Sequence, residues 1–357
     1  MSHQVLLTVS GTIPADLDAQ VKAGQRPQAD YRVMAAQFGA DLLDYPAARK
    51  VSGLIGKLME RVGGPDLMLA WACFTLRKRY RVIVTDGEQI GLPLAAMFKF
   101  LGLGRRPRHL MIVHIISVPK KMIFLDRLRV QSQIDRFLVY ATAQKQFIER
   151  RWKIAPQRVV LTPFMVDSDF FAPSKVQAQQ TEPMICAVGL ERRDYPTLLK
   201  AVTGLPAKVV IAAASPWSKR SDSTQGQMIP ANVEVRRFSQ HELRRLYADS
   251  RFLVMPLENV EFQAGITAIL EAMAMERAVI CSRTPGQTDA VVEEVTGIYV
   301  PPADPVALRA ALERLLNQPE VASRMGKAGR QRIEEQMSLQ HYAAGLTRLV
   351  REAEAQG

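Results

Sequence analysis

The sequence predicts an α/β protein with two domains, each built on a parallel β-sheet that is covered by helices on both faces. At 357 residues the chain exceeds the size at which a single hydrophobic core usually stops growing. Short apolar runs rich in β-branched residues alternate with amphipathic stretches along nearly the whole chain. Continuous apolar strands flanked by helices are typical of buried parallel sheets, so two such series indicate two Rossmann-like domains.

Nine apolar runs are expected to form the strands, four in the first half and five in the second: 4–11, 81–87, 109–116 and 136–142, then 184–189, 207–215, 233–238, 251–257 and 278–282. A polar segment at 170–183 separates the two series, which places the domains at 1–170 and 171–337. The terminal helix, residues 338–357, is expected to pack back on the first domain. In sheets of this kind ligands bind beyond the carboxyl ends of the strands.

Composition limits the cellular setting. The three cysteines lie far apart in apolar runs, which indicates reduced core residues and a reducing compartment: Cys73, Cys186 and Cys281. The first 14 residues have no basic leader, and the longest apolar run, near 109–118, is shorter than the ~20 residues that span a bilayer. We therefore expect a cytoplasmic protein that does not cross a membrane and has no metal site.

Positive charge is concentrated in one segment of a chain whose net charge is +12. Between Arg105 and Arg158 there are thirteen Lys and Arg residues against three acidic ones. Within it, residues 118–137 mix large apolar residues with four cations: Lys120, Lys121, Arg127 and Arg129. This mixture favours a membrane surface or an anionic acceptor. The alternatives are a helix on the sheet with a solvated charged face, and nucleic-acid binding, which the 7% aromatic content disfavours.

The stretch "QAGITAILEAMAMERAVICS", residues 263–282, predicts a helix that begins beside a glycine. Thr267 is a suitable N-cap after Gly265, and Glu271 lies about one turn into the helix. Four apolar residues share one helical face: Ile266, Ile269, Leu270 and Met273. The amides of Gly265, Ile266 and Thr267 at the positive end of this helix suit a diphosphate. The alternative for Glu271 is a carboxylate that only complements the helix dipole.

From Gly265 to about Arg330 the motifs "ILEAMA", "TPGQTDAVVEEVTG" and "GIYVPPADP" follow one another without a gap. In this order they resemble the second half of the family-four glycosyltransferases (glycosyl transferases group 1), which are retaining enzymes of the GT-B fold. Residues 159–173, 185–202 and 233–258 resemble the family's interdomain segment, its donor-phosphate turn and its base-binding stretch. The resemblance is strong over 155–350 and weak before it. It implies two Rossmann-like domains with parallel sheets that face each other across a cleft.

The resemblance also implies site residues. It places Gly189, Arg192 and Arg193 at the donor diphosphate and the loop of Phe238 and Ser239 at the nucleotide base. In the first half it places His114 at the transferred sugar, as a catalytic residue, and Gly11 near the donor. Taken alone, the arginine pair would be a solvated loop, His114 a core histidine and Gly11 a turn glycine.

Gln263 marks a departure from the family pattern, because the family has a glutamate eight residues before the one that matches Glu271. A neutral amide is not a nucleophile for double displacement. Gln263 is then left to hydrogen-bond sugar hydroxyls, and retention would proceed by same-face attack on the donor. Glu258 and Glu261 are the alternatives for the first position of the paired motif.

The expected function is a retaining, metal-independent hexosyltransferase without a cofactor. Its donor would be a UDP or GDP sugar, and its acceptor a glycan, a lipid-linked molecule or a small molecule. A peripheral position at the inner face of the membrane would suit a lipid-linked acceptor. The alternatives are a GT-B epimerase or phosphorylase and a non-catalytic sugar-nucleotide-binding protein. An NAD oxidoreductase is disfavoured, because neither half has a G-x-G-x-x-G motif after its first strand.

Overall fold

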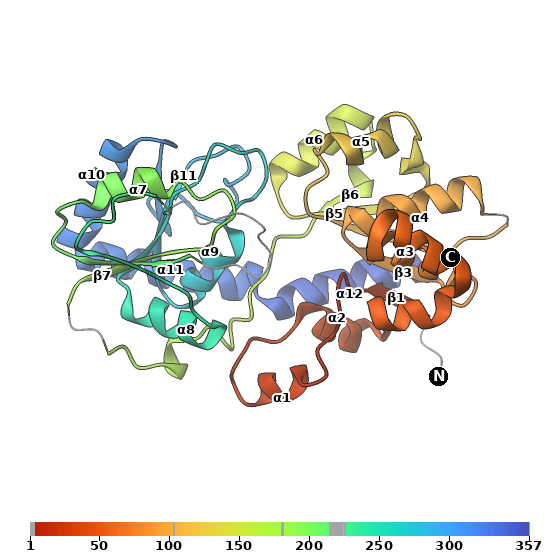
Figure 1. Cartoon of the computed structure of the whole chain (residues 1–357), viewed down its shortest axis with the longest axis horizontal. Coiled ribbons are helices and arrows are strands. Elements are labelled where there is room, and N and C mark those ends of the chain that lie inside the picture. Colours follow the sequence, from red (N-terminus) through yellow and green to blue (C-terminus); the bar gives the residue numbers. More distant parts are fainter. Residues whose placement is uncertain (1–3, 103, 180–181, 214–223, 225, 357) are drawn as a thin grey trace. The chain divides into compact units, whose positions relative to one another are not determined.

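A computed structural model describes residues 4–102, 104–179, 182–213, 224 and 226–356. The chain divides into two compact units (Figure 1). The first unit contains residues 1–18, 29–163 and 342–357, and the second contains residues 19–28 and 164–341. The division along the main chain thus falls at residues 163–164, whereas the sequence analysis placed it at 170–171. The last two residues of the predicted strand 207–215 lie outside the described part of the chain.

The first unit is built on a six-stranded sheet with the order β2-β1-β3-β4-β5-β6, and every neighbouring pair is parallel. Its strands are β1 (Val5–Thr8), β2 (Ala40–Leu43), β3 (Val82–Asp86), β4 (Arg108–Val113), β5 (Arg136–Val139) and β6 (Val159–Leu161). Its helices are α2 (Asp30–Phe38), α3 (Tyr45–Leu76), α4 (Glu88–Phe100), α5 (Pro119–Asp126) and α6 (Thr142–Trp152). Helix α1 (Leu17–Lys22) and helix α12 (Leu339–Ala355) each include residues of both units.

The second unit repeats the architecture with the order β12-β11-β10-β7-β8-β9, again with every neighbouring pair parallel. Its strands are β7 (Met184–Val188), β8 (Lys208–Ala212), β9 (Val233–Arg236), β10 (Phe252–Met255), β11 (Ala278–Ser282) and β12 (Gly297–Val300). Its helices are α7 (Tyr195–Val202), α8 (Gln240–Asp249), α9 (Ile266–Ala274), α10 (Pro305–Asn317) and α11 (Pro319–Arg332). The two parallel sheets confirm the predicted α/β class.

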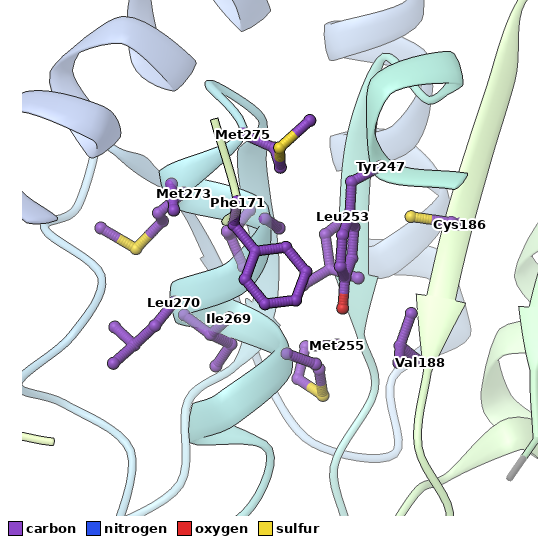
Figure 2. Close-up of a cluster of buried hydrophobic side chains, with 14 of the residues drawn as sticks. Phe171, Cys186, Val188, Tyr247, Leu253, Met255, Ile269, Leu270, Met273 and Met275 are labelled. Atoms are coloured by element: carbon purple, nitrogen blue, oxygen red, sulfur yellow. The ribbon is translucent and has the colours of Figure 1, made fainter. Parts of the chain in front are cut away.

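Both faces of the second sheet are covered by apolar cores, as the continuous apolar strands predict. Figure 2 shows one of these cores, where the Tyr247 ring of α8 lies beside Leu253 between α9 and β7. Helix α9 contributes Ile269, Leu270 and Met273 to the same cluster. This packing holds the start of α9 at the edge of the sheet where β10 ends.

In each sheet the strand order reverses beside the strand that comes first in sequence. The reversal lies between β1 and β3 in the first unit and between β7 and β10 in the second. Loops that leave such neighbours run in opposite directions and open a crevice at the carboxyl ends of the strands. The two switch points are therefore the candidate ligand sites of the two units.

Candidate functional site

The switch point of the second unit lies between two loops, 189–194 after β7 and 256–265 before α9. Backbone bonds join them, because Glu258 N donates to Arg192 O at 3.0 Å and Asp194 N donates to Pro256 O at 3.0 Å. Asp194 has a local structural role. Its carboxylate accepts from Thr197 N at 3.1 Å and caps the start of α7.

Arg193 is buried between these loops. Its Nε donates to Val188 O at 2.9 Å and its Nη1 to Glu191 O at 2.5 Å. Gly189 has φ 100° and Gly265 φ 78°, and a Cβ at these positions would lie 2.5 Å and 3.4 Å from Arg193 Nη2. The guanidinium therefore fills space that two glycines leave open. The structure thus brings together Gly189, Arg193 and Gly265, three of the predicted donor residues.

Arg192 has a different environment, although it is the neighbour of Arg193. Its backbone is left-handed (φ 57°), and its partly exposed side chain pairs with Glu258, with Nη1 at 2.9 Å from Oε2. This ion pair joins the two loops at the surface. It also occupies Glu258, one of the two alternatives for the first glutamate of the paired motif.

Helix α9 begins at Ile266, directly after Gly265, and not after an N-cap at Thr267 as expected. Gly265 is the N-cap residue, and no side chain caps this helix end. The Thr267 side chain is exposed in the first turn, so the predicted cap is wrong. A first turn without a side-chain acceptor leaves amides of Ile266 and Thr267 without an intrahelical partner, which suits an anion.

Gln263 lies in the loop that leads to α9, and its Oε1 is buried with no hydrogen-bond partner among the described residues. Glu261, the remaining alternative, is exposed. A buried amide oxygen without a donor costs ~1–3 kcal/mol, a cost that a hydroxyl group from a bound ligand would remove.

Gln287 supports this loop and was not predicted. It is fully buried, and its Nε2 donates to Ala264 O at 2.8 Å. A Cβ on the neighbouring Gly286 would lie 2.2 Å from Phe262 O, so the two loops are in close contact. Sequence spacing gave no signal for this contact, because the two segments are joined through β11 and its flanking turns.

Glu271 is 7% exposed, in the second turn of α9. The Tyr247 hydroxyl donates to its Oε2 at 2.8 Å. Burial raises the pKa of Glu271 from 4.5 to about 7, while the hydrogen bond from Tyr247 acts in the opposite direction. Glu271 is therefore a buried carboxyl whose protonation changes near neutral pH, and not an exposed group that only complements the helix dipole.

Phe238 and Ser239 follow β9, which is two strands away from β7 in the sheet. Ser239 forms a capping box with Glu242 at the start of α8, with Ser239 N donating to Oε2 at 2.7 Å. The guanidinium of Arg236 lies 4.2 Å from the centre of the Phe238 ring. Phe238 is partly buried and packs against the apolar cluster that includes residues of α9.

In the first unit, the switch point holds Gly11 and an Asp86–His114 pair. Within the described residues, no atom beyond Gly11 and its two chain neighbours lies within 4 Å of a Cβ built on Gly11. Ser10 Oγ donates to Asp86 O at 2.8 Å, which joins the loops after β1 and β3. His114 Nε2 lies 2.9 Å from Asp86 Oδ1, and the imidazole is partly exposed. His114 is therefore not the core histidine of the alternative interpretation.

Burial lowers the pKa of His114, but the hydrogen bond and the charge of Asp86 raise it more, so the net direction is upward. Burial, together with the charge of Asp86, raises the pKa of Asp30 to about 6. Neither acid was predicted as a site residue. Asp86 could have been identified from the sequence, since it ends an apolar strand, whereas Asp30 is the first residue of α2 and belongs to no motif.

We expect Asp86→Asn to lower the pKa of His114, because burial remains while the main raising influence is lost. A raised histidine pKa stabilises the fold below the unfolded value near 6.5 and loses that effect as pH rises through the folded value. The variant should therefore lose more stability at pH 5.5 than at pH 8. The measurements are an NMR titration of His114 and urea unfolding at both pH values, with Asp126→Asn as the control. An unchanged His114 titration would contradict the prediction.

The predicted basic patch is only partly a surface feature. Lys121 is largely buried, and its Nζ donates to Ile115 O at 3.0 Å and lies 3.4 Å from Glu88 Oε1. Lys121 thus ties the loop after β4 to α4, and its assignment to a membrane or acceptor patch stays a prediction. The other three cations are exposed: Lys120, Arg127 and Arg129.

Metal-binding clusters and membrane-spanning helices are both absent from the described part of the chain. Within the described residues, no cluster of three or more His, Cys, Asp or Glu side chains has the arrangement of a metal site. Among the same residues, every helix is too short or too polar for a transmembrane span. The three cysteines are buried and reduced, as expected: Cys73, Cys186 and Cys281.

Known proteins are similar to this chain in sequence and in fold. Residues 170–332 match the family model of glycosyl transferases group 1. Alpha-1,3/1,6-mannosyltransferase ALG2 of Mus musculus is 36% identical over 81 residues, 23% of this chain and 19% of that protein. The chain thus matches about a fifth of the length of that curated relative.

Two solved structures are similar over nearly the whole chain. Sucrose-phosphate synthase from Thermosynechococcus elongatus has a TM-score of 0.72 and 20% identity, with 99% of both chains covered. Anabaena Alr3699/HepE in complex with UDP-glucose has a TM-score of 0.66 and 11% identity, with 98% of this chain and 99% of the other covered. At these identities the likeness establishes the fold.

Proposed function

We propose that the chain is a hexosyltransferase that uses a nucleotide-diphosphate sugar, because residues 170–332 match the glycosyl transferases of group 1 and the chain has the GT-B fold. The observation that supports this most is the position of Arg193. Its buried guanidinium lies between two loop glycines at the switch point, beside a helix that begins without a side-chain cap. A cation and free helix amides at one crevice fit a diphosphate.

The proposed reaction breaks the bond between the anomeric carbon and the diphosphate, so negative charge develops on the departing phosphate. Arg193 and the amides of Ile266 and Thr267 are fixed donors that would stabilise this charge without reorganisation. Arg192 would add a second cation at the surface of the same loop pair. These groups make the proposed reaction metal-independent.

Retention of configuration would follow from attack on the same face from which the phosphate leaves. Gln263 has no nucleophilic carboxylate, and its buried Oε1 without a partner fits a hydroxyl of the donor sugar. Glu258 is paired with Arg192, and Glu261 is exposed. Neither carboxylate therefore has the buried, unpaired oxygen that Gln263 has. The leaving phosphate would accept the proton of the acceptor hydroxyl.

The remaining residues complete the proposal. Glu271 would contact the donor, the loop of Phe238 and Ser239 would hold the base, and His114 and Gly11 would act from the first unit. The donor would be a UDP or GDP sugar; the related structure of Alr3699/HepE contains UDP-glucose. The acceptor would be a glycan or a lipid-linked molecule at the cytoplasmic face of a membrane, with Lys120, Arg127 and Arg129 as candidate acceptor contacts.

A screen of sugar nucleotides tests the proposed activity. A bound donor should raise the melting temperature, and one sugar nucleotide should release its nucleoside diphosphate at the same rate with and without EDTA. Release that requires an added divalent metal would contradict metal independence. Binding without turnover over a broad panel of acceptors would instead identify a non-catalytic sugar-nucleotide-binding protein.

The same-face reaction predicts that Gln263→Glu changes kcat by less than about tenfold, because same-face attack needs no nucleophile from the enzyme. Gln263→Leu should reduce kcat/KM by about 10–100-fold, since it removes a hydrogen bond to the sugar. Intact-mass measurement with donor alone should show no sugar attached to Gln263→Glu or to the wild type. A glycosyl adduct on Glu258 or Glu261 would contradict same-face attack.

A further inference from the structure

Helix α3 contains a segment whose apolar side chains face outward. Non-helical backbone at Gly53 (φ 61°) and Gly64 (φ 78°) separates residues 54–63 from the helical turns on either side. Large apolar side chains in this segment are unusually exposed: Leu54 83%, Ile55 50%, Leu58 59% and Val62 77%. An ordinary surface helix buries such residues and exposes its polar ones.

The spacing of these residues makes the exposed face continuous. Leu54, Leu58 and Val62 follow one another at four-residue intervals, and such residues stack along one side of a helix. Ile55 lies at the edge of the same side. We call residues Leu54, Ile55, Leu58 and Val62 the apolar face of α3.

The opposite side of the segment explains why this face points outward. A Cβ on Gly56 would lie 2.1 Å from Ser52 Cβ and 3.6 Å from Trp71 Cδ1. Trp71 Nε1 also donates to Ser52 O at 3.2 Å. The segment is therefore attached to the rest of α3 by its small residue, whereas Leu54, Ile55, Leu58 and Val62 stay exposed.

Charge indicates what covers the apolar face. Lys57 and Arg61 are exposed and lie one turn apart beside it, and Lys50 is exposed just before it. Glu60 is the only acidic residue between Tyr45 and Pro65, and Arg49 Nη2 holds it at 2.6 Å. A second copy of this chain would present the same cations, so like charges oppose self-association. An anionic surface complements them.

We propose that the apolar face of α3 inserts into the headgroup region of an anionic lipid bilayer. Helices that lie in the membrane interface combine a buried apolar side with flanking lysines and arginines, as this segment does. Each cation near an anionic surface adds attraction, and each large apolar residue leaves water. This contact is separate from the patch of Lys120, Arg127 and Arg129, and it does not depend on the proposed activity.

Vesicle co-sedimentation of the full chain tests this contact. Wild-type protein should sediment with vesicles of phosphatidylcholine and phosphatidylglycerol and much less with phosphatidylcholine alone. The double variant Leu54→Gln/Leu58→Gln should bind the anionic vesicles at least about tenfold more weakly, because two leucines no longer leave water. Lys57→Gln/Arg61→Gln should weaken binding in a salt-dependent way. Val306→Gln, an exposed apolar residue of α10, is the matched control.

A second measurement reports on insertion itself. Tryptophan at position 54, introduced as Leu54→Trp, should be quenched by brominated lipid in anionic vesicles. All substituted side chains are exposed, so melting temperature and nucleoside diphosphate release from soluble donor should match the wild type. These readouts separate failure of membrane binding from failure of the proposed activity.

Four outcomes would overturn the proposal. Insertion of this face is excluded by a wild type that sediments with neither vesicle, by a leucine variant that binds as well as the wild type, or by a tryptophan at position 54 that is not quenched. A monomer produced by Leu54→Gln/Leu58→Gln from an oligomeric wild type would show instead that a second copy covers it.

Discussion

Arg193→Ala is expected to lower kcat/KM for sugar transfer by at least about 100-fold, the range seen when a fixed donor to a developing negative charge is removed. The side chain is buried at the switch point of the second sheet, and it donates to Val188 O and Glu191 O. Its loss would remove the central cation of the site and leave two carbonyls without their donor. The assay is nucleoside diphosphate release with the best donor from the screen.

A structural effect must be separated from a chemical one. Arg193→Ala should also lower the free energy of unfolding by ~1–3 kcal/mol, because buried carbonyls lose a partner. Arg193→Lys keeps the charge but not the planar fork, so it should fold well and recover only part of the activity. Arg324→Ala on α11 is the control. Wild-type turnover by a folded Arg193→Ala would show that the diphosphate is held elsewhere.

The central strands were predictable because they are continuous apolar runs. All nine expected runs overlap a strand of the structure. The three strands that were missed are β2, β6 and β12, and each lies at the edge of its sheet. An edge strand is covered less completely, so β2 and β6 have partly exposed residues and a weaker apolar signal. The residues of β12 were identified only as part of a family motif and were not predicted to form a strand.

Within the candidate site, the sequence predicted which loops matter better than what each side chain does. Gly189, Arg193 and Gly265 converge as expected, because their loops leave neighbouring strands. The role of a side chain differed from the prediction where a tertiary contact determined that role. Gly265 takes the cap position expected for Thr267, and the contact of Lys121 with Glu88 of the neighbouring helix α4 was not predicted. Such contacts have no periodic signature in the chain.

Glu271→Gln is expected to change the pH dependence of stability more than any other substitution considered. Burial raises the pKa of Glu271 to about 7, so between pH 4.5 and about 7 the folded protein holds a proton that the unfolded chain has lost. Stability therefore falls as pH rises through this window, and above it the full cost of a buried carboxylate remains. Glutamine has no such proton, yet its amide oxygen can still accept the Tyr247 hydroxyl.

The expected difference in the free energy of unfolding between the variant and the wild type is up to about 3 kcal/mol, since each unit of the pKa shift corresponds to about 1.4 kcal/mol. The variant should thus be more stable than the wild type at pH 8 and close to it at pH 4.5, as measured by urea unfolding across this range. Glu335→Gln on an exposed surface should leave the profile unchanged. Parallel profiles for Glu271→Gln and the wild type would contradict the raised pKa.

Activity should change in the opposite direction from stability. If the charged carboxylate of Glu271 contacts the donor, Glu271→Gln should lose turnover at pH 8, where the wild type is ionised, and resemble the wild type near pH 5.5. Glu271→Ala should be inactive at both pH values, because the Tyr247 hydroxyl then also loses its acceptor. A stabilised but slow Glu271→Gln would show that the cost of burying this carboxylate is retained for its role in the site.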